Sequence, residues 1–359
     1  MCFLSFPDAS DNSWYLYNYC IENNIDYELV WLVDEENVEI KNKILSIKKS
    51  VEVKIVKRWS LKGFIYFCSS KFVFHTHGTY FFIRKVFRAP IIVNLWHGMP
   101  IKAIGFLDSK DNLVDCSDFS ISTSIFYQDI IAESFGLKKQ NVLISNLPRN
   151  DVLYNGISSK EKESIYKKLG LNQGVKIIIW LPTYRVSNTG DIRRDSASNS
   201  FLNDLDNLFL EKLNKICYLK KFYVLIKLHP MDALNILDYQ DKYSYIKFYD
   251  SATWSSLGIE LYDLLSMSNG LISDFSSVII DCIPTSIPVG MIEGSENNYS
   301  RKIVTPLKLV KENIFTISSA EDIGELVFFR KRNLSKSIFV DEKSCGASSN
   351  FIIDRLLGK

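Results

Sequence analysis

The sequence has no apolar run long enough to cross a membrane, no paired cysteines and almost no net charge. Its apolar runs fall short of the ~18 residues that a transmembrane helix needs, and its N-terminus lacks a secretory-signal pattern. The seven cysteines are scattered without a C-x-x-C pair. This argues against a disulfide framework and a zinc site and fits a reducing compartment. A balance of 43 Lys and Arg against 41 Asp and Glu disfavours a nucleic-acid binder. With 9 Pro, 16 Gly and 47% hydrophobic residues, the chain is typical of a packed globular protein.

The 359 residues suggest two domains, at about 150 residues per domain. Short apolar runs alternate with stretches of helical periodicity, which is typical of βα units stacked around parallel sheets. A polar segment rich in lysine and glutamate over residues 155–174 predicts a solvated helix and a linker between two α/β halves. The apolar runs predict strands over residues 2–6, 27–33, 53–56, 72–76, 91–96, 118–122 and 141–145, and then over 175–181, 222–228, 246–249, 270–273 and 288–291.

Two histidines directly follow predicted strands, one in each half. His97 can take a proton from a hydroxyl nucleophile because histidine titrates near neutrality, and Gly98 lets the backbone approach a ligand closely. In the second half, Lys227 and His229 lie on one side of a strand end, where a cation and an imidazole suit a phosphate. The alternative for His97 is a histidine packed at the edge of a sheet. The alternative for Lys227 and His229 is a solvated lysine beside a structural histidine.

Two arginines also lie beyond strand ends. Arg149, followed by Asn150 and Asp151, comes after the strand at 141–145, and Arg185 comes two residues after Thr183. A guanidinium in such a position can hold a phosphate through two parallel hydrogen bonds. The alternative for each is an ordinary solvated turn.

A serine-rich segment runs from the strand at 270–273 into an apolar helix. Ser273 and Asp274 end the strand, and Ser276 and Ser277 stand at the start of the helix, where free N–H groups and hydroxyls can bind a phosphate. Asp281 follows about one turn inside the helix and can reach a ribose diol. The alternative is an ordinary serine cap.

Three further segments have mainly structural interpretations. Residues 11–13 predict the cap of a helix. His75 and His77 can lie on one face of a strand, but no third metal ligand lies nearby in the sequence. We therefore expect packing or an acceptor contact for them, and no metal site. We also expect that no cofactor is required, with Mg²⁺ left open. The basic and aromatic residues 80–88 are typical of a core, with contact to a membrane surface as the alternative.

These segments occur in an order that resembles the CDP-glycerol glycerophosphotransferase family of teichoic acid and capsule synthesis. The resemblance covers nearly the whole chain. It is carried by Ser5-Phe6-Pro7 with Ser10-Asp11-Asn12, Leu95-Trp96-His97-Gly98-Met99-Pro100-Ile101-Lys102, Pro148-Arg149-Asn150-Asp151, Leu181-Pro182-Thr183-Tyr184-Arg185, Lys227-Leu228-His229-Pro230, Leu271-Ile272-Ser273-Asp274-Phe275-Ser276-Ser277 with Asp281, and Gly346-Ala347-Ser348-Ser349.

The resemblance implies an α/β fold of the GT-B type, two Rossmann-like domains facing each other across a cleft. Residues 1–155 are then the acceptor domain, with a C-terminal helix at 340–359 packing back on it, and residues 156–339 bind a CDP donor. The implied reaction transfers a polyol phosphate, glycerol phosphate in the first place, to a hydroxyl of a lipid-linked glycan or polymer and releases CMP. The implied location is cytoplasmic, peripheral to the inner face of a bacterial cell membrane, with no nucleic acid as partner.

The resemblance also implies roles for individual residues. His97 is the implied base for the acceptor hydroxyl, which predicts an acid limb of the pH profile near the ordinary histidine range. His229 is an implied ligand of the donor phosphate or an electrostatic stabiliser. The implied diphosphate ligands are Arg185, Ser276 and Ser277, and the implied ribose ligand is Asp281. Further residues expected to contact the substrates are Gly98, Arg149, Asn150, Asp151, Thr183, Lys227, Ser273 and Asp274.

Two departures from the family pattern lie near this site. Met99 stands where the family commonly has Thr, and Ser273-Asp274-Phe275-Ser276-Ser277 stands where it commonly has Thr-Asp-Tyr-Ser-Ser. The donor or acceptor can therefore differ from glycerol phosphate. Two other functions stay open: a GT-B glycosyltransferase that uses a nucleotide sugar, and a non-catalytic subunit of a polymer-synthesis complex. Release of CMP separates the first of these from a polyol-phosphate transferase.

Overall fold

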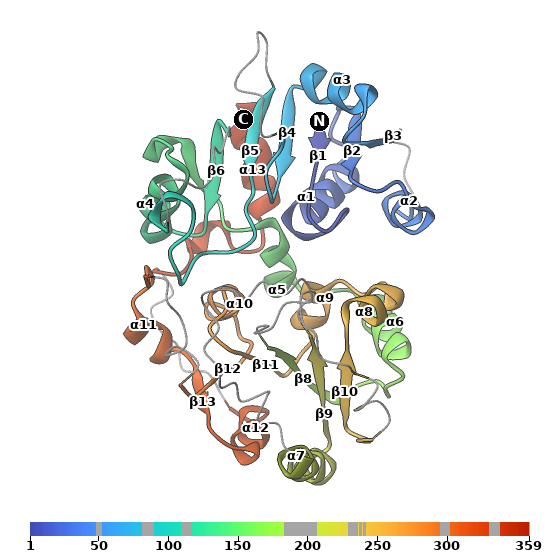
Figure 1. Cartoon of the computed structure of the whole chain (residues 1–359), viewed down its shortest axis with the longest axis vertical. Coiled ribbons are helices and arrows are strands. Elements are labelled where there is room, and N and C mark those ends of the chain that lie inside the picture. Colours follow the sequence, from blue (N-terminus) through green and yellow to red (C-terminus); the bar gives the residue numbers. More distant parts are fainter. Residues whose placement is uncertain are drawn as a thin grey trace. The chain divides into compact units, whose positions relative to one another are not determined.

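The protein consists of two α/β units, each built on one parallel sheet (Figure 1). The first unit contains Met1–Met99, Ile104–Asp151 and the C-terminal residues 338–358, and the second contains Pro100–Ala103 and the described residues from Val152 to 329. The computed structural model describes residues 1–47, 52–80, 90–108, 117–182, 207–228, 236, 239, 242–294, 302–329 and 338–358.

The first unit has a seven-stranded sheet in the order β3-β2-β1-β4-β5-β6-β7. All of its strand pairs are parallel, with Cys2 opposite both Val30 and Val73. The direction of winding reverses between β1 and β4, which is where open parallel sheets bind ligands beyond their carboxyl ends. The strands are β1 (Cys2–Phe3), β2 (Leu29–Val33), β3 (Val53–Lys57), β4 (Phe72–His75), β5 (Ile91–Asn94), β6 (Phe119–Ser122) and β7 (Val142–Ile144).

Helices pack against this sheet and bury its apolar residues. Phe3 at the centre of the sheet stacks on Phe74 and contacts Trp31, and all three side chains are fully buried. Burial of such aromatic side chains is a main source of stability in an α/β unit. The helices are α1 (Asp11–Glu22), α2 (Val38–Leu45), α3 (Leu61–Ser69), α4 (Ile125–Phe135) and α13 (Ser348–Leu357), with 3₁₀ turns at Gly105–Leu107, Lys139–Asn141, Pro148–Asn150 and Glu342–Ser344.

The second unit has a six-stranded parallel sheet in the order β10-β9-β8-β11-β12-β13, which is the Rossmann order with its reversal between β8 and β11. Its strands are β8 (Lys176–Leu181), β9 (Phe222–Lys227), β10 (Ile246–Tyr249), β11 (Gly270–Ser273), β12 (Val289–Ile292) and β13 (Phe315–Ile317). Its helices are α5 (Asp151–Asn155), α6 (Ser159–Leu169), α7 (Asn207–Lys220), α8 (Ser251–Leu257), α9 (Leu261–Ser266), α10 (Val278–Cys282), α11 (Leu307–Lys311) and α12 (Ala320–Leu326).

A short segment of the second unit comes from the middle of the first half of the sequence. Residues Pro100–Ala103 run antiparallel to residues 302–305, with Lys102 opposite Ile303. The N–H of Ala103 donates to the Lys302 carbonyl at 2.7 Å, and the Thr305 hydroxyl donates to the Pro100 carbonyl at 2.6 Å.

The predicted α/β class is confirmed, and all the predicted strands are present with ends shifted by at most a few residues. The predicted solvated helix is α6, whose N-cap Ser158 and Glu161 form a capping box. Strand β13 was not predicted. It has three residues, too few for an apolar run or an alternation to stand out from the polar residues around it.

The C-terminal helix α13 belongs to the first unit and is held there by Asp151. The carboxylate of Asp151 accepts hydrogen bonds from the N–H of Ser348 at 2.8 Å, from its hydroxyl at 2.5 Å and from the N–H of Ser349 at 3.1 Å. Tyr19 of α1 donates to the side chain of Asn350 at 2.6 Å. Asp151 was predicted to contact substrate, but in the structure its carboxylate caps α13, so we assign it a structural role.

We expect Asp151→Ala to lower the free energy of unfolding by about 1–3 kcal/mol, because it removes a cap and leaves buried N–H groups without an acceptor. Urea unfolding followed by circular dichroism measures the change. Asp129→Ala is the control, because the Asp129 carboxylate lies on the surface beside Lys139 and we expect a change below about 0.5 kcal/mol. Equal losses in the two variants would contradict the capping role.

Candidate active site

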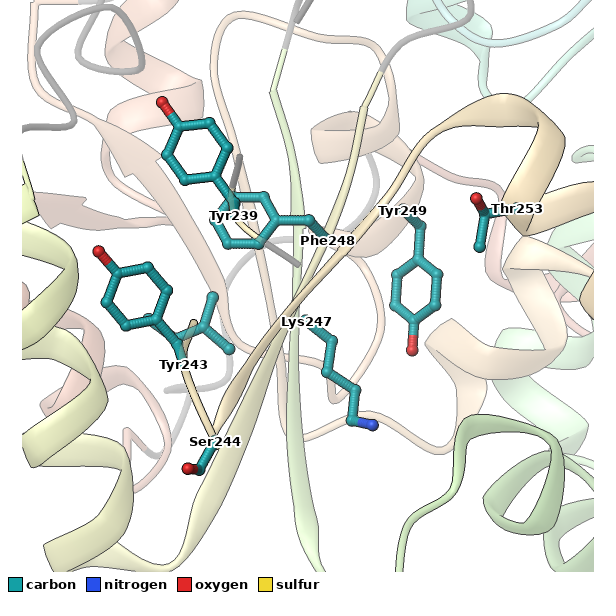
Figure 2. Close-up of a pocket in the computed structure, with 8 residues that line it drawn as sticks. Tyr239, Tyr243, Ser244, Lys247, Phe248, Tyr249 and Thr253 are labelled. Atoms are coloured by element: carbon teal, nitrogen blue, oxygen red, sulfur yellow. The ribbon is translucent and has the colours of Figure 1, made fainter. Parts of the chain in front are cut away.

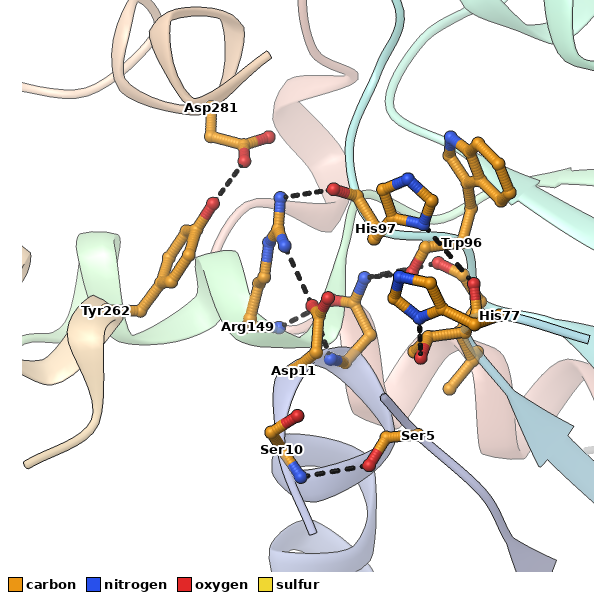
Figure 3. A network of polar contacts seen from close by, with 12 residues as sticks. Ser5, Ser10, Asp11, His77, Trp96, His97, Arg149, Tyr262 and Asp281 are labelled. Atoms are coloured by element: carbon orange, nitrogen blue, oxygen red, sulfur yellow. Dashed lines mark hydrogen bonds and ion pairs between the residues drawn. The ribbon is translucent and has the colours of Figure 1, made fainter. Parts of the chain in front are cut away.

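Three loops at the carboxyl ends of the first sheet are joined by Arg149 (Figure 3). One guanidinium nitrogen of Arg149 donates to the Asp11 carboxylate at 2.8 Å, and the other donates to the His97 carbonyl at 3.0 Å. The exposed fractions of the two charged side chains are 8% and 15%, so water screens this ion pair weakly. Arg149 therefore fixes the loop that carries His97 to the start of α1.

Asn12 makes a second set of contacts between the same loops. Its amide NH₂ donates to the Trp96 carbonyl at 2.8 Å, and its carbonyl accepts from the N–H of Arg149 at 3.1 Å. The predicted cap at residues 11–13 is wrong: the N-cap of α1 is Ser10, and it makes no side-chain cap bond. Residues 11–13 lie inside the helix, and their side chains fasten it to neighbouring segments, since Ser13 donates to the Leu4 carbonyl at 2.7 Å.

The backbone of these loops adopts unusual conformations. Trp96 and Asp11 have φ of +49° and +58°, in the left-handed region that side chains other than glycine rarely occupy. Gly98 has φ of +134°, which requires a glycine. Such conformations cost on the order of 1–3 kcal/mol each and persist where the surroundings enforce them, commonly at functional sites.

The imidazole of His97 is oriented by its surroundings. Its Nδ1 lies 3.4 Å from the Thr76 carbonyl, which can only accept, so Nδ1 carries the hydrogen and Nε2 keeps its lone pair. Burial, and then the nearby His77, lower the pKa of His97 to about 3, although Asp11 opposes this. His97 is therefore neutral at pH 7 and presents an acceptor nitrogen. The acid limb of the pH profile of turnover, which was expected near the ordinary histidine range, is therefore expected at lower pH.

The lowered pKa of His97 predicts a loss of stability in acid. Between about pH 6.5, its ordinary value, and pH 3, the unfolded chain binds a proton at this site that the folded chain does not. The contribution is therefore complete above pH 6.5 and is lost as the pH falls. We expect the urea midpoint to fall more between pH 7 and pH 5 in the native protein than in His97→Asn, whose side chain does not titrate. Identical falls would contradict the assignment.

The remaining residues predicted beside His97 lie at its loops but contact the chain itself. Asn150 is buried, and its side chain contacts that of Asn146 at 3.3 Å. His75 accepts from the N–H of Gly78 at 2.9 Å and contacts the Ser117 hydroxyl at 2.8 Å, which agrees with the packing role. Across the part of the chain that the structure describes, no group of three potential ligands could hold a metal ion.

In the second unit, the predicted serine segment lies at the reversal of its sheet. The Ser273 hydroxyl donates to the Leu181 carbonyl at 2.8 Å and so joins β11 to β8, and Asp274 is buried. Ser276 and Ser277 precede α10 and are half-buried. Ser277 is the N-cap without a side-chain cap bond, so the alternative of an ordinary serine cap fails for it.

Two charged residues of the second unit have distinct environments. Asp281 is 1% exposed and accepts a hydrogen bond from the Tyr262 hydroxyl (Figure 3). Lys227 ends β9, and burial lowers the pKa of its ammonium group. The ammonium lies 5.7 Å from the ring centroid of Trp254, and no carboxylate of the described residues forms an ion pair with it. The predicted residues Thr183, Arg185 and His229 lie outside the described residues.

A pocket of about 290 Å³ lies elsewhere, along the edge strand β10 (Figure 2). It contains none of the predicted site residues, so it is not our candidate for the active site. Its lining is Tyr239, Tyr243, Ser244, Ile246, Lys247, Phe248, Tyr249 and Thr253.

Sequence reasoning missed the contacts that shape the first site. Asp11 and Asn12 belong to a recognised segment, but they were interpreted as a helix cap. Thr76 and His77 were considered only as packing or as a weak metal pair. The sequence did contain one signal for them. Both residues directly follow β4, which flanks the reversal of the sheet, where ligands bind in open parallel sheets.

Two parallel α/β units, each with polar residues beyond the carboxyl ends of its strands, are typical of the GT-B fold. The family model for CDP-Glycerol:Poly(glycerophosphate) glycerophosphotransferase matches residues 1–309, and the chain belongs to this family. The predicted family, GT-B fold type and transferase class are confirmed.

Known proteins of this kind are similar over most of the chain. The teichoic acid poly(glycerol phosphate) polymerase of Bacillus spizizenii is 26% identical over 76% of this chain and 68% of its own length. The teichoic acid ribitol-phosphate polymerase TarL of Staphylococcus aureus is also 26% identical, over 77% of this chain and 46% of its own length. The solved structure of the wall teichoic acid polymerase TagF matches 99% of this chain and 88% of that chain, with a TM-score of 0.66 and 20% identity.

Proposed function

We propose that the protein transfers a polyol phosphate, glycerol phosphate in the first place, from a CDP-activated donor to a hydroxyl of a lipid-linked glycan or polymer in teichoic acid or capsule-type synthesis. Beyond the family itself, the observation that carries this proposal is the neutral His97, which follows β5 at the carboxyl ends of the first sheet and is held with Nε2 as acceptor. A TagF structure soaked with CDPG belongs to the same group of relatives and supports a CDP-linked donor.

The second unit offers groups that suit the donor diphosphate. Lys227 provides a partly buried cation, and among the described residues no carboxylate neutralises it. The hydroxyls of Ser276 and Ser277 make no hydrogen bond to the described residues. A diphosphate needs such cations and donors. From the family resemblance we add Arg185 and His229 as diphosphate ligands and Asp281 as a ribose ligand, with no metal or cofactor required.

In the proposed reaction, His97 Nε2 takes the proton of the acceptor hydroxyl as its oxygen bonds to the phosphorus that carries the polyol. The bond from that phosphorus to the oxygen bridging the diphosphate breaks, and CMP leaves with the negative charge. Phosphoryl transfer depends mainly on positioning and charge stabilisation, which a fixed imidazole and the groups around the donor diphosphate can supply.

The decisive experiment incubates the purified protein with CDP-glycerol, CDP-ribitol and UDP-sugars together with a lipid-linked acceptor and measures the released nucleotide. We expect CMP. We expect His97→Ala to reduce turnover by ~10²–10⁴-fold while donor affinity stays near that of the native protein. We expect His229→Ala to weaken both donor binding and turnover.

Lys212→Ala serves as the control for these variants, because Lys212 pairs with Glu321 on the surface of the second unit and should leave turnover unchanged. Near-native turnover in His97→Ala would contradict the base. Release of a nucleoside diphosphate from a UDP-sugar would favour a glycosyltransferase. No turnover with any donor would favour a non-catalytic subunit.

A lipid-linked acceptor leads us to propose a cytoplasmic protein attached peripherally to the inner face of the membrane. Among the described residues, no helix has both the length and the apolar character to span a bilayer. We propose that residues 80–88 make the attachment. Of these only Tyr80 is described, and its ring packs edge-on against Phe67 at 4.9 Å between centroids.

We expect the protein to sediment with anionic vesicles at low salt and to be released as salt screens the attraction between basic residues and lipid. Replacing Arg84, Lys85 and Arg88 together by Gln should abolish this sedimentation, whereas neutral vesicles should bind neither protein. Equal sedimentation of the native and triple-variant proteins would contradict attachment through residues 80–88 without bearing on the chemistry.

A further inference from the structure

The ring of His77 lies against the ring of His97 in a face-to-face stack. The two ring centroids are 4.3 Å apart, and the ring planes differ by only 8° (Figure 3). Trp96 contacts the His97 ring at 3.9 Å between centroids, and Phe6 meets His77 at 5.7 Å with its ring nearly edge-on. A ring held by neighbours in this way cannot turn freely about its side-chain bonds. The stack therefore fixes the plane in which the His97 lone pair points.

A single residue, Thr76, sets the spacing of the two imidazoles. Its hydroxyl lies 2.8 Å from Nδ1 of His77, and its carbonyl lies 3.4 Å from Nδ1 of His97. The Thr76 side chain is fully buried at the end of β4. Both imidazoles are thus oriented through the same nitrogen.

The stacked imidazoles are coupled electrostatically. The charged groups of the described residues that act on both rings are Asp11 from α1 and Arg149 from the turn after β7, and their effects have opposite signs. Burial lowers the pKa of both histidines, and the charge of His77 lowers that of His97 further. A proton on His77 therefore opposes a proton on His97. A second proton at this spacing would place two like charges in contact.

We propose that His77 is a positioning residue for His97, holding the plane of its imidazole by stacking and limiting the stacked pair to one proton. This rests on the proposed role of His97 as base. Before transfer the pair is neutral. The acceptor hydroxyl gives its proton to His97 Nε2 as its oxygen bonds to phosphorus, and that proton passes to water after CMP has left. A proton on His77 in acid prevents His97 from taking another.

Two variants separate the stacking effect from the charge effect. His77→Phe keeps a flat ring beside His97 but cannot titrate, and His77→Ala removes both ring and charge. Turnover, donor KM and the pH profile of turnover are measured on the full chain with the donor and acceptor used above. NMR titration of the imidazole signals is measured in parallel. With four histidines in the chain the signals can be assigned by substitution, and the folded state of each variant is checked by its unfolding temperature.

We expect His77→Ala to lower turnover about tenfold at pH 7.5 with donor KM unchanged, because the base loses its orientation. We expect His77→Phe to keep turnover within about threefold at that pH. In His77→Phe the acid limb of turnover should move to lower pH by about one unit, because position 77 can no longer bind a proton. The NMR midpoint of His97 should move the opposite way, to higher pH, because a like charge has been removed.

An unchanged NMR midpoint of His97 in His77→Phe, or native turnover in a folded His77→Ala, would overturn the proposal. Failure of the proposed function gives a different result: the NMR midpoint of His97 moves as expected, but His97→Asn retains turnover. In that case the stacked pair is real and His97 is not the base.

Discussion

The first unit depends on the buried contact of Arg149 with Asp11 and with the His97 carbonyl. This contact joins α1, the loop after β5 and the turn after β7, which are far apart in the sequence. Taking two charges out of water is costly and is compensated only if the partners stay together, so removing either would leave an uncompensated buried charge. The loop after β5 contains Trp96 in its unusual backbone conformation, and its His97 carbonyl accepts from Arg149.

The parallel sheets were predictable because buried strands leave a strong local signal of apolar runs. The position of His97 beyond β5 and of Ser276 before α10 follows from the same pattern. The sequence did not show that Asp151 turns towards α13, because its partners Ser348 and Ser349 lie almost two hundred residues further along the chain. No local pattern reports a contact of that separation.

The same limit explains the helix cap that was wrongly expected at residues 11–13. Asp, Asn and Ser are the usual capping residues, so a local interpretation favours a cap. In the folded unit Asn12 finds acceptors in the Leu95 and Trp96 carbonyls, and tertiary contacts take precedence over the local preference. The stacking of His77 on His97 is equally invisible to periodicity, since only the parallel pairing of β4 with β5 brings the two loops together.

The segment Pro100–Ala103 affects how the protein can be divided for expression. These four residues follow directly on the loop that carries His97, yet they pair with residues 302–305 of the second unit. A fragment that begins at Val152 therefore lacks part of its own unit, and the Thr305 hydroxyl loses its acceptor. A fragment that ends at Asp151 carries those four residues without their partners and omits α13. The proposed donor binding by the second unit alone is best studied with Pro100–Ala103 supplied as a linked peptide.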